Sequence, residues 1–362
     1  MIESPAPQVS VVIPTRNGGE AWRRTLDALL GQDLEVPFEL IVIDTASTDG
    51  TPDLAEQRFR SAASNPRRIP LRLERITPQQ FGHGRTRNLG ARLACGEIVV
   101  FLSQDATPVG SHWLAALVTP FADGQTVGAF CRQVALPGIR LPERFILETT
   151  YPPRSSMRTR DSLASRDAGY ILFSNAASAI RREALLATPF DEAVMMCEDT
   201  HWAVRVLEAG RRIAYVADAS VAHSHNYTLR AIFSRNFDYA VALEGLPGSM
   251  GLRSYLHYLR REVAFLARHN GIVAMPWTAA FEAARCLGYV LGARQRRLPT
   301  WLVRRISGYP QWFVRGDGPD TPASSRMRSA VALNRDSKQE MENTMSGSGD
   351  SFSERSREAP CP

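Results

Sequence analysis

The sequence predicts an α/β fold in which a mostly parallel, twisted sheet is flanked by helices. One observation is a series of short β-branched apolar runs, such as Val9–Ile13 and Ile98–Leu102, which are typical of buried strands. The other is that helix-like segments, closed by glycines such as Gly31 and Gly96, separate these runs. Strands that alternate with helices favour a parallel sheet, in which ligands bind at the carboxyl ends of the strands.

The elements of this pattern are assigned along the chain in order. Strands are predicted at 9–13 (stopped by Pro14), 38–43, 71–76 and 98–102, with helices at 20–30, after a turn at 47–51, and at 84–95. Farther on, we expect strands at 127–134, 172–180 and 213–216, a turn at 217–220, loops at 136–142 and 151–167, and helices at 198–208, 228–243 and 255–268. The arginine-rich loop at 151–167 is expected to be mobile. The chain therefore divides into a flexible N-terminus (1–8), an α/β domain (9–227), a helical basic extension (228–315) and a disordered tail (316–362).

Composition narrows the class of protein. With 44% hydrophobic and 22% charged residues, the 362-residue chain resembles an ordinary soluble globular protein. A net charge of +6 indicates an acidic partner, which is a nucleotide, an anionic lipid or a nucleic acid. Five scattered cysteines without a Cys-x-x-Cys pair predict neither disulfides nor a zinc site, and they favour a reducing compartment. We expect no signal peptide and no transmembrane helix.

Polar residues recur directly after the apolar strands. The four groups are Pro14-Thr15-Arg16-Asn17, Asp44 with Asp49, Ser103-Gln104-Asp105, and His223-Ser224-His225. One such residue is often only a turn or cap residue. Because the groups recur at the same edge of a parallel sheet, they predict a functional site there.

The order of these motifs resembles the family 2 glycosyltransferases, which have the GT-A fold, and is most similar to the bacterial rhamnosyltransferase-like branch. The similarity covers about residues 9–245 and is carried by Val11–Asn17, Ile41–Gly50, Phe81–Asn88, Phe101–Ala106, Cys197–Asp199 and His223–Tyr227. It implies transfer of a sugar from a nucleoside-diphosphate sugar to an acceptor hydroxyl, with inversion. The implied donor is dTDP-rhamnose, and the implied acceptor is a saccharide or a lipid-linked saccharide of surface polysaccharide or glycolipid synthesis.

The resemblance also assigns the donor side of the site. Pro14, Thr15, Arg16, Asn17 and Gln104 would line the nucleotide pocket, Asp44 would take the base or ribose, and Arg87 and Asn88 would face the diphosphate. A carboxylate suits the role of Asp44 because it accepts hydrogen bonds from base N–H groups and ribose hydroxyls. Asp49 has two interpretations, a donor contact or an Asx-type turn cap. His83 and Arg85 are likewise either donor contacts or surface residues.

The family's metal motif, Asp-x-Asp, is Ser103-Gln104-Asp105 in this chain, so its first acid is missing. Asp105 is the predicted ligand of Mg²⁺ or Mn²⁺, together with His223, which we favour over His225. Hard divalent cations keep water and phosphate oxygens as ligands, so one carboxylate is tolerable. The missing acid also leaves open a non-catalytic nucleotide-sugar-binding or scaffold protein. A nucleotidyltransferase would need a longer Gly-rich loop than Gly18-Gly19.

Glu198 and Asp199 begin a predicted amphipathic helix that also carries Trp202. Acids are common at helix N-termini, so a purely structural role is the alternative. An apolar neighbour raises the pKa of a carboxylate toward that of a useful base. By resemblance Asp199 is the catalytic base, and Glu198, Trp202 and Asn175 are predicted at the acceptor site.

Seven arginines and no acidic residue occur between Arg285 and Arg315, interleaved with aromatic and aliphatic residues. This pattern is typical of a helix that lies on an anionic membrane surface. The alternative is a helical lid on the catalytic domain. The donor-site motifs argue against nucleic acid as a partner. We expect a cytoplasmic protein, with the inner face of the cytoplasmic membrane as an alternative location, and predict no oligomeric state.

Overall fold

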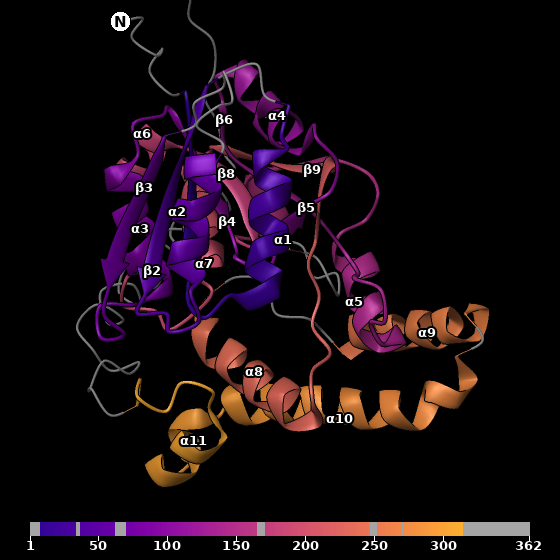
Figure 1. The fold of residues 1–362 in the computed structure, drawn as a ribbon. Coiled ribbons are helices and arrows are strands. Elements are labelled where there is room, and N and C mark those ends of the chain that lie inside the picture. The colour runs from indigo at the N-terminus through magenta and orange to yellow at the C-terminus, as the bar shows by residue number, and fades with distance from the viewer. Residues whose placement is uncertain are drawn as a thin grey trace, which may run out of the picture. The chain divides into compact units, whose positions relative to one another are not determined.

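The computed structural model describes residues 8–33, 37–61, 70–164, 171–246, 252–269 and 271–313. The predicted tail, and the predicted flexible N-terminus except for Gln8, lie outside these residues. The described strands form a nine-stranded mixed sheet in the order β3-β2-β1-β4-β8-β6-β9-β5, with β7 paired to β9. Helices flank this sheet, which confirms the predicted α/β class (Figure 1).

Four parallel strands form the half of the sheet that carries the predicted nucleotide site. They are β1 (Val9–Thr15), β2 (Phe38–Thr45), β3 (Leu71–Ile76) and β4 (Ile98–Leu102). Strands such as β1 and β2 are covered on both faces, which explains their continuous apolar sequence. Pro14 does not stop β1 as predicted. Because β4 pairs with β1 only as far as Val12, the missing N–H of Pro14 interrupts no bond between these two strands.

Two hydrophobic cores lie on the two faces of the sheet. Helices α1 (Gly19–Leu30), α2 (Thr51–Ser61) and α4 (Trp113–Val118) cover one face through Trp22, Leu26, Ala55, Trp113 and Leu117. Helices α3 (His83–Leu93), α6 (Arg182–Ala187) and α7 (Glu198–Glu208) cover the other through Ala91, Leu185, Trp202, Val206 and Leu207. The cores hold the loops at the carboxyl ends of β1 to β4 on a rigid base.

The second half of the sheet departs from the predictions. It contains β5 (Thr107–Pro108), β6 (Thr126–Val134), β7 (Ser156–Arg158), β8 (Ala177–Arg181) and β9 (Arg212–Ala222). The turn predicted at 217–220 is wrong, because β9 continues through it and its pairing with β6 skips from Val216 to Ser220. The loop predicted at 151–167 contains β7 and the 3-10 helix η3 (Arg160–Ala164). Arg158 of β7 is buried, with its guanidinium 5.7 Å from the ring centre of Tyr215.

The loop predicted at 136–142 is followed by α5 (Leu141–Thr150), and the C-terminal helices begin after β9. These are α8 (Leu229–Ala242), α9 (Leu252–Arg268), α10 (Met275–Gly292) and α11 (Thr300–Ile306), with short 3-10 turns η4 (Ile272–Ala274) and η5 (Gln295–Arg297). Helix α10 packs closely on α8, since a Cβ at Gly288 or Gly292 would collide with the backbone of Phe233 or Phe237. Helix α9 packs on α5 through aromatic residues. None of the described helices is both long enough and apolar enough to cross a bilayer.

Candidate active site

The segments that follow β1 and β2 are joined by hydrogen bonds. The Thr15 hydroxyl donates to Asp44 Oδ1 at 3.0 Å, and the Ser47 amide and hydroxyl donate to the same carboxylate at 2.9 and 2.6 Å. The Asn17 amide donates to Ser47 Oγ, and Asn17 Oδ1 accepts from the Thr48 amide at 2.9 Å. The structure therefore brings the predicted residues Thr15, Asn17 and Asp44 together at one sheet edge.

Asp49 ties the first turns of two helices to this edge. Its carboxylate accepts from the Thr51 amide at 3.1 Å, from the Thr51 hydroxyl at 2.6 Å and from the Gly19 amide at 3.0 Å. These bonds, the Thr51 hydroxyl foremost, lower the pKa of Asp49. These contacts are those of a turn cap, which is one of the two roles considered for Asp49. A donor contact for Asp49 stays a prediction.

Gln104 joins the segment after β4 to the segment after β1. Its Oε1 accepts from the Arg16 amide at 2.8 Å, and its Nε2 donates to the Arg16 carbonyl at 3.1 Å. Both bonds use the backbone of Arg16, which is exposed. Pro14, two residues earlier near the end of β1, is half-buried. The contacts place Pro14, Arg16 and Gln104 at the same edge, and their contact with a nucleotide stays a prediction.

Three described non-glycine residues have a left-handed backbone: Asn17 (φ 47°), Ala46 (φ 49°) and Cys197 (φ 63°). Asn17 follows β1, Ala46 follows β2, and Cys197 directly precedes the two acids of α7. Such a conformation costs on the order of 1–3 kcal/mol and is concentrated at functional sites. The strained positions therefore coincide with the site that the motifs predict.

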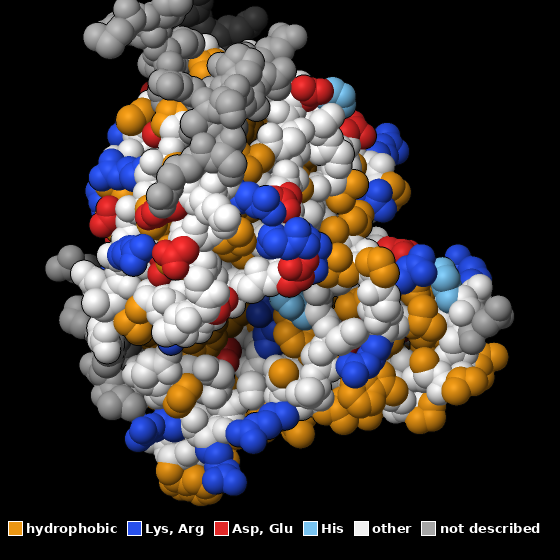
Figure 2. All heavy atoms as spheres, in the orientation of Figure 1, with side chains coloured by type: hydrophobic (Ala, Val, Ile, Leu, Met, Phe, Trp, Pro, Cys, Tyr) orange, Lys and Arg blue, Asp and Glu red, His pale blue; other side chains and the backbone are white. Residues whose placement is uncertain are grey.

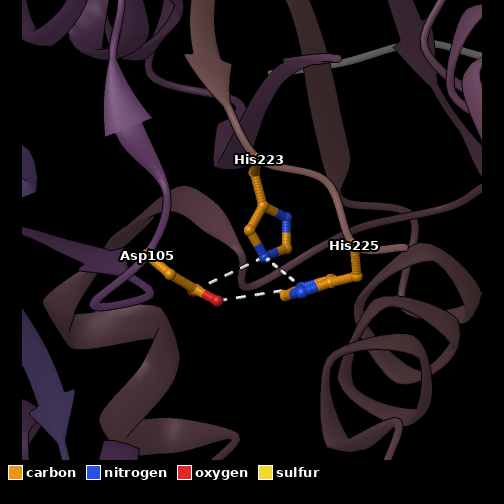
Figure 3. A group of neighbouring side chains, drawn as sticks. All are labelled: Asp105, His223 and His225. Carbon is orange, nitrogen blue, oxygen red and sulfur yellow. Dashed lines mark hydrogen bonds and ion pairs between the residues drawn. The ribbon is translucent and has the colours of Figure 1, made fainter. Parts of the chain in front are cut away.

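Asp105, His223 and His225 converge on one point (Figure 3). The Nε2 of His223 lies 3.5 Å from Asp105 Oδ1, the Nε2 of His225 lies 3.8 Å from Asp105 Oδ2, and the two Nε2 atoms are 3.1 Å apart. One ligand atom of each residue lies within 4.8 Å of the others. Burial and the charge of His223 lower the pKa of His225, which favours the neutral imidazole that binds a metal. This donor set fits a divalent cation.

Gln133 orients this cluster, and sequence reasoning missed it. Its Oε1 lies 2.8 Å from His223 Nδ1, so Nδ1 carries the proton and Nε2 faces Asp105 with its lone pair. Gln133 is itself buried on β6 and donates to the Tyr151 and Ser174 hydroxyls. Nothing near Gln133 in the sequence marks it, because its partner follows a strand 90 residues later.

Glu198 and Asp199 lie at the N-terminus of α7 in different environments. Glu198 Oε1 accepts from Arg87 Nη1 at 3.0 Å and from Asn175 Nδ2 at 3.2 Å. Asp199 accepts from the backbone amides of Asn175 at 3.0 Å and Thr200 at 2.7 Å. Glu198 is therefore neutralised by a buried cation, whereas the described contacts of Asp199 are backbone amides and the Thr200 hydroxyl.

The two acids have pKa values shifted in opposite directions, because Arg87 pairs with Glu198 and not with Asp199. Burial raises the pKa of Asp199 to about 6, and the charge of Glu198 acts in the same direction. Burial opposes the ionisation of Glu198 as well, but Arg87 holds the pKa of Glu198 below its usual range. A pair of acids with separated pKa values is typical of a site in which one acts as a general base. The pKa of Asp199, about 6, suits a general base.

Burial bears on the three residues predicted at the acceptor side, which are Trp202, Asn175 and Glu198. Trp202 is fully buried, with its ring 5.0 Å from that of Phe173, and its contact with an acceptor stays a prediction. Asn175 and Glu198 are 1% and 4% exposed, and Asn175 donates to both acids, from its backbone amide to Asp199 and from its side chain to Glu198. Acceptor contacts of these two residues stay predictions. The side chain of Trp202 belongs to the hydrophobic core beneath α7.

The predicted phosphate-facing residues of α3 have protein partners. Arg87 is buried against Glu198, and the amide of Asn88 bonds Phe190 and Glu192 of the loop before α7. Arg85 is exposed and pairs with Glu192. Diphosphate contacts by Arg87 and Asn88 therefore stay predictions, and both side chains have structural contacts that were not foreseen.

Two further residues approach the site from the C-terminal helices. The Tyr309 hydroxyl lies 3.2 Å from His83 Nε2, because Asp238 of α8 binds Ser307 Oγ at 2.6 Å and the Gly308 amide at 2.7 Å. Arg235 of α8 is exposed, and its guanidinium lies 5.6 Å from the ring centre of Tyr227. Burial is the main cause of the lowered pKa of His83 and of His225, and the charge of Arg235 contributes to both. Arg235 therefore lies within electrostatic reach of both histidines.

The fold and this combination of groups define a glycosyltransferase of the GT-A type. The family model for glycosyl transferase family 2 matches residues 10–186. The O-antigen chain rhamnosyltransferase RfbN of Salmonella typhimurium is 30% identical over 84% of this chain and 96% of its own length. WbaN of Salmonella anatum, with the same description, is 31% identical over 85% and 96%. The chain belongs to glycosyl transferase family 2 and is a glycosyltransferase.

Solved structures agree on the fold. The mannosyltransferase PcManGT from Pyrobaculum calidifontis, solved in complex with GDP-mannose and Mn²⁺, superimposes with a TM-score of 0.52. It is 22% identical, and the match covers 81% of this chain and 87% of that one. The predicted GT-A fold is confirmed.

Proposed function

We propose that this enzyme transfers rhamnose from dTDP-rhamnose to a hydroxyl of a growing surface polysaccharide or of its lipid-linked precursor, with inversion at the anomeric carbon. Two relatives that span most of the chain carry the name O-antigen chain rhamnosyltransferase, which supports this donor and acceptor. The observation that carries the proposal is that the chain has both a carboxylate with a raised pKa, Asp199, and a cluster of possible metal ligands, Asp105, His223 and His225.

Asp199 acts as the general base of the proposed reaction. The Asn175 and Thr200 amides fix its carboxylate, and its raised pKa makes it a stronger base than an exposed aspartate. It accepts the acceptor's hydroxyl proton while that oxygen attacks the anomeric carbon and the bond to the diphosphate breaks. Glu198, paired with Arg87, keeps its negative charge and sustains the raised pKa of Asp199.

Asp105, His223 and His225 are the proposed ligands of a divalent cation. Two imidazole nitrogens with one carboxylate favour Mn²⁺ over Mg²⁺, which prefers oxygen ligands. When bound, such a cation supplies Lewis-acid stabilisation of the charge on the leaving diphosphate. His225 offers the third ligand atom in a chain that lacks an acid at Ser103, and the Gln133 bond favours the tautomer of His223 that can bind.

Arg235 is the proposed second source of positive charge for the diphosphate. No described carboxylate forms an ion pair with it, its guanidinium lies 5.6 Å from the ring centre of Tyr227, and its charge reaches both His83 and His225. A guanidinium binds phosphate oxygens with two parallel hydrogen bonds, which favours this role over a purely structural one. Arg87 is less suited to it because Glu198 already neutralises its charge.

A donor screen tests the proposed substrate. Binding of dTDP-rhamnose, UDP-sugars and GDP-sugars is measured by calorimetry with Mn²⁺, with Mg²⁺ and with a chelator. We expect dTDP-rhamnose to bind at least tenfold more tightly than the other donors, and more tightly with Mn²⁺ than with Mg²⁺. Preference for a UDP- or GDP-sugar would overturn the rhamnosyl assignment. Equal binding in the chelator would overturn the role of Asp105, His223 and His225.

A further inference from the structure

Helix α10 has one face packed on the protein and one that is free in the described structure. Its inward face carries Phe281, Gly288 and Gly292 against α8. The two charged residues of the helix also point inward. Glu282 is 6% exposed and accepts from Arg285, whose guanidinium donates to the Tyr258 hydroxyl as well. The outward face of α10 is therefore left without charge.

The outward face is a continuous apolar stripe. Its exposed residues recur at steps of three and four, which places them on one side of the helix. They are Pro276, Ala279, Ala283, Leu287 and Val290, and we call them the α10 stripe. Leu287 is 54% exposed and Val290 is 45% exposed. A helix of a water-soluble protein normally places polar residues on such a face, so this exposure needs a partner.

Exposed groups at both ends extend the stripe. At its start, Ile272 and Val273 of η4 are 69% and 93% exposed. After its end, Trp301 of α11 is 67% exposed, with Arg294, Arg297, Arg304 and Arg305 exposed around it in the sequence. Arg296 is exposed as well but pairs with Glu244. Figure 2 shows hydrophobic and basic side chains gathered along the side of the molecule formed by α10 and α11.

We propose that the α10 stripe, with Ile272, Val273 and Trp301, lies on an anionic lipid bilayer, with the nearby arginines binding lipid phosphates. Charge complementarity selects this occupant: the segment from Cys286 to Arg315 contains arginines and no acidic residue. An apolar strip bordered by arginine and tryptophan matches the boundary between acyl chains and headgroups. The lid and membrane interpretations of this region then apply to opposite faces of the same helix. The lid face packs on α8, and the membrane face is the stripe.

The position of the stripe bears on the acceptor. Helix α8, on which α10 packs, carries Arg235 at the active site and Asp238, which holds the segment that reaches His83. A bilayer under α10 would therefore lie one helix away from the site. This arrangement suits an acceptor whose lipid end stays in the membrane while its sugar end reaches Asp199.

The test measures co-sedimentation of the full chain with vesicles of phosphatidylcholine, alone or mixed with phosphatidylglycerol. We expect binding to the mixed vesicles and at least tenfold weaker binding to phosphatidylcholine alone. The double substitution Leu287→Asp/Val290→Asp should reduce partition at least tenfold, and Arg297→Glu/Arg304→Glu at least twentyfold, since each basic residue near an anionic surface contributes roughly fivefold. Leu186→Asp and Arg92→Glu, on exposed parts of α6 and α3, are the matched controls and should bind like the original chain.

Each alternative outcome has a defined meaning. Binding that is equal for both vesicles, or unchanged in both double variants, would overturn the proposal. A dimer in sedimentation velocity that Leu287→Asp/Val290→Asp converts to a monomer would overturn it in favour of a second copy of the chain. Vesicle binding needs no turnover, so Asp199→Asn should bind vesicles normally. Failure of the rhamnosyl assignment would leave this result unchanged.

Discussion

His223 Nδ1 and Gln133 Oε1 lie 2.8 Å apart, and this contact decides which nitrogen of His223 faces Asp105. In the structure Gln133 Nε2 donates to the Tyr151 and Ser174 hydroxyls, which leaves Gln133 Oε1 to accept from His223 Nδ1. The contact joins β6 to the segment after β9 and prepares the cluster to bind a cation. Such outer-sphere partners typically change metal affinity 10- to 100-fold.

Replacing Gln133 should therefore weaken metal binding without removing a ligand. Gln133→Ala is expected to lower Mn²⁺ affinity roughly 10- to 100-fold in a calorimetric titration. Gln125 is an exposed glutamine directly before β6, so Gln125→Ala is the matched control and should bind Mn²⁺ normally. Unchanged Mn²⁺ affinity in Gln133→Ala would show that the tautomer of His223 does not depend on this bond.

The transfer rate should fall in acid because Asp199 must be ionised to accept a proton. Its pKa is raised to about 6, so kcat should be constant above about pH 7 and fall about tenfold per pH unit well below 6. Glu198→Gln removes a negative charge that raises this pKa, so the acidic limb should move to lower pH. A pH–rate profile of both proteins checks this. An acidic limb that stays in place or moves upward would contradict the coupling.

The Arg87–Glu198 pair should be important for stability. Both side chains are buried, so Arg87→Met would leave an uncompensated carboxylate and cost about 3–5 kcal/mol of unfolding free energy. The neighbouring Arg85→Met breaks an exposed pair with Glu192 and should cost less than about 1 kcal/mol. Urea unfolding measures both. Equal, small losses would mean that Arg87 is free to serve the donor instead.

Arg235 should contribute to donor binding. Arg235→Met is expected to weaken dTDP-rhamnose binding roughly tenfold, equivalent to about 1.4 kcal/mol, with little effect on stability. Arg230→Met is the control, since five residues along a helix place it on another side of α8. Calorimetry with each variant decides the matter. Equal donor affinities for both would remove Arg235 from the phosphate site.

Much of the fold could be predicted because its signals are local. The strands β1, β2 and β4 are buried runs whose apolar sequence is visible in short windows, and α7 has the predicted bounds, 198–208. The continuation of β9 through Ala217–Ser220 was missed because it depends on pairing with distant strands across an irregular register. Helix α5 was missed because Pro142 was taken as a loop signal, although proline is also favoured in the first turn of a helix.

The site was predictable where its residues follow strands. Asp105 and His223 stand at such positions, and the structure places them beside each other. Asp199 stands instead in the first turn of α7, where it was assigned by the family resemblance, and burial raises its pKa. The burial of Trp202 and the partners of Arg87 and Asn88 could not be foreseen, because they depend on how α3 and α7 pack on the sheet. Gln133 and Arg235 lack any local signal and required the three-dimensional arrangement.

Asp199→Asn tests the central claim most directly. Transfer from dTDP-rhamnose and donor affinity are measured on the same preparation, with Asp191→Asn, a half-buried acid before α7, as the matched control. We predict that kcat falls about 10²- to 10⁴-fold while donor affinity changes less than about twofold, because a general base acts on the acceptor and leaves the donor pocket intact. Turnover that remains within a few-fold of the original enzyme would contradict the account.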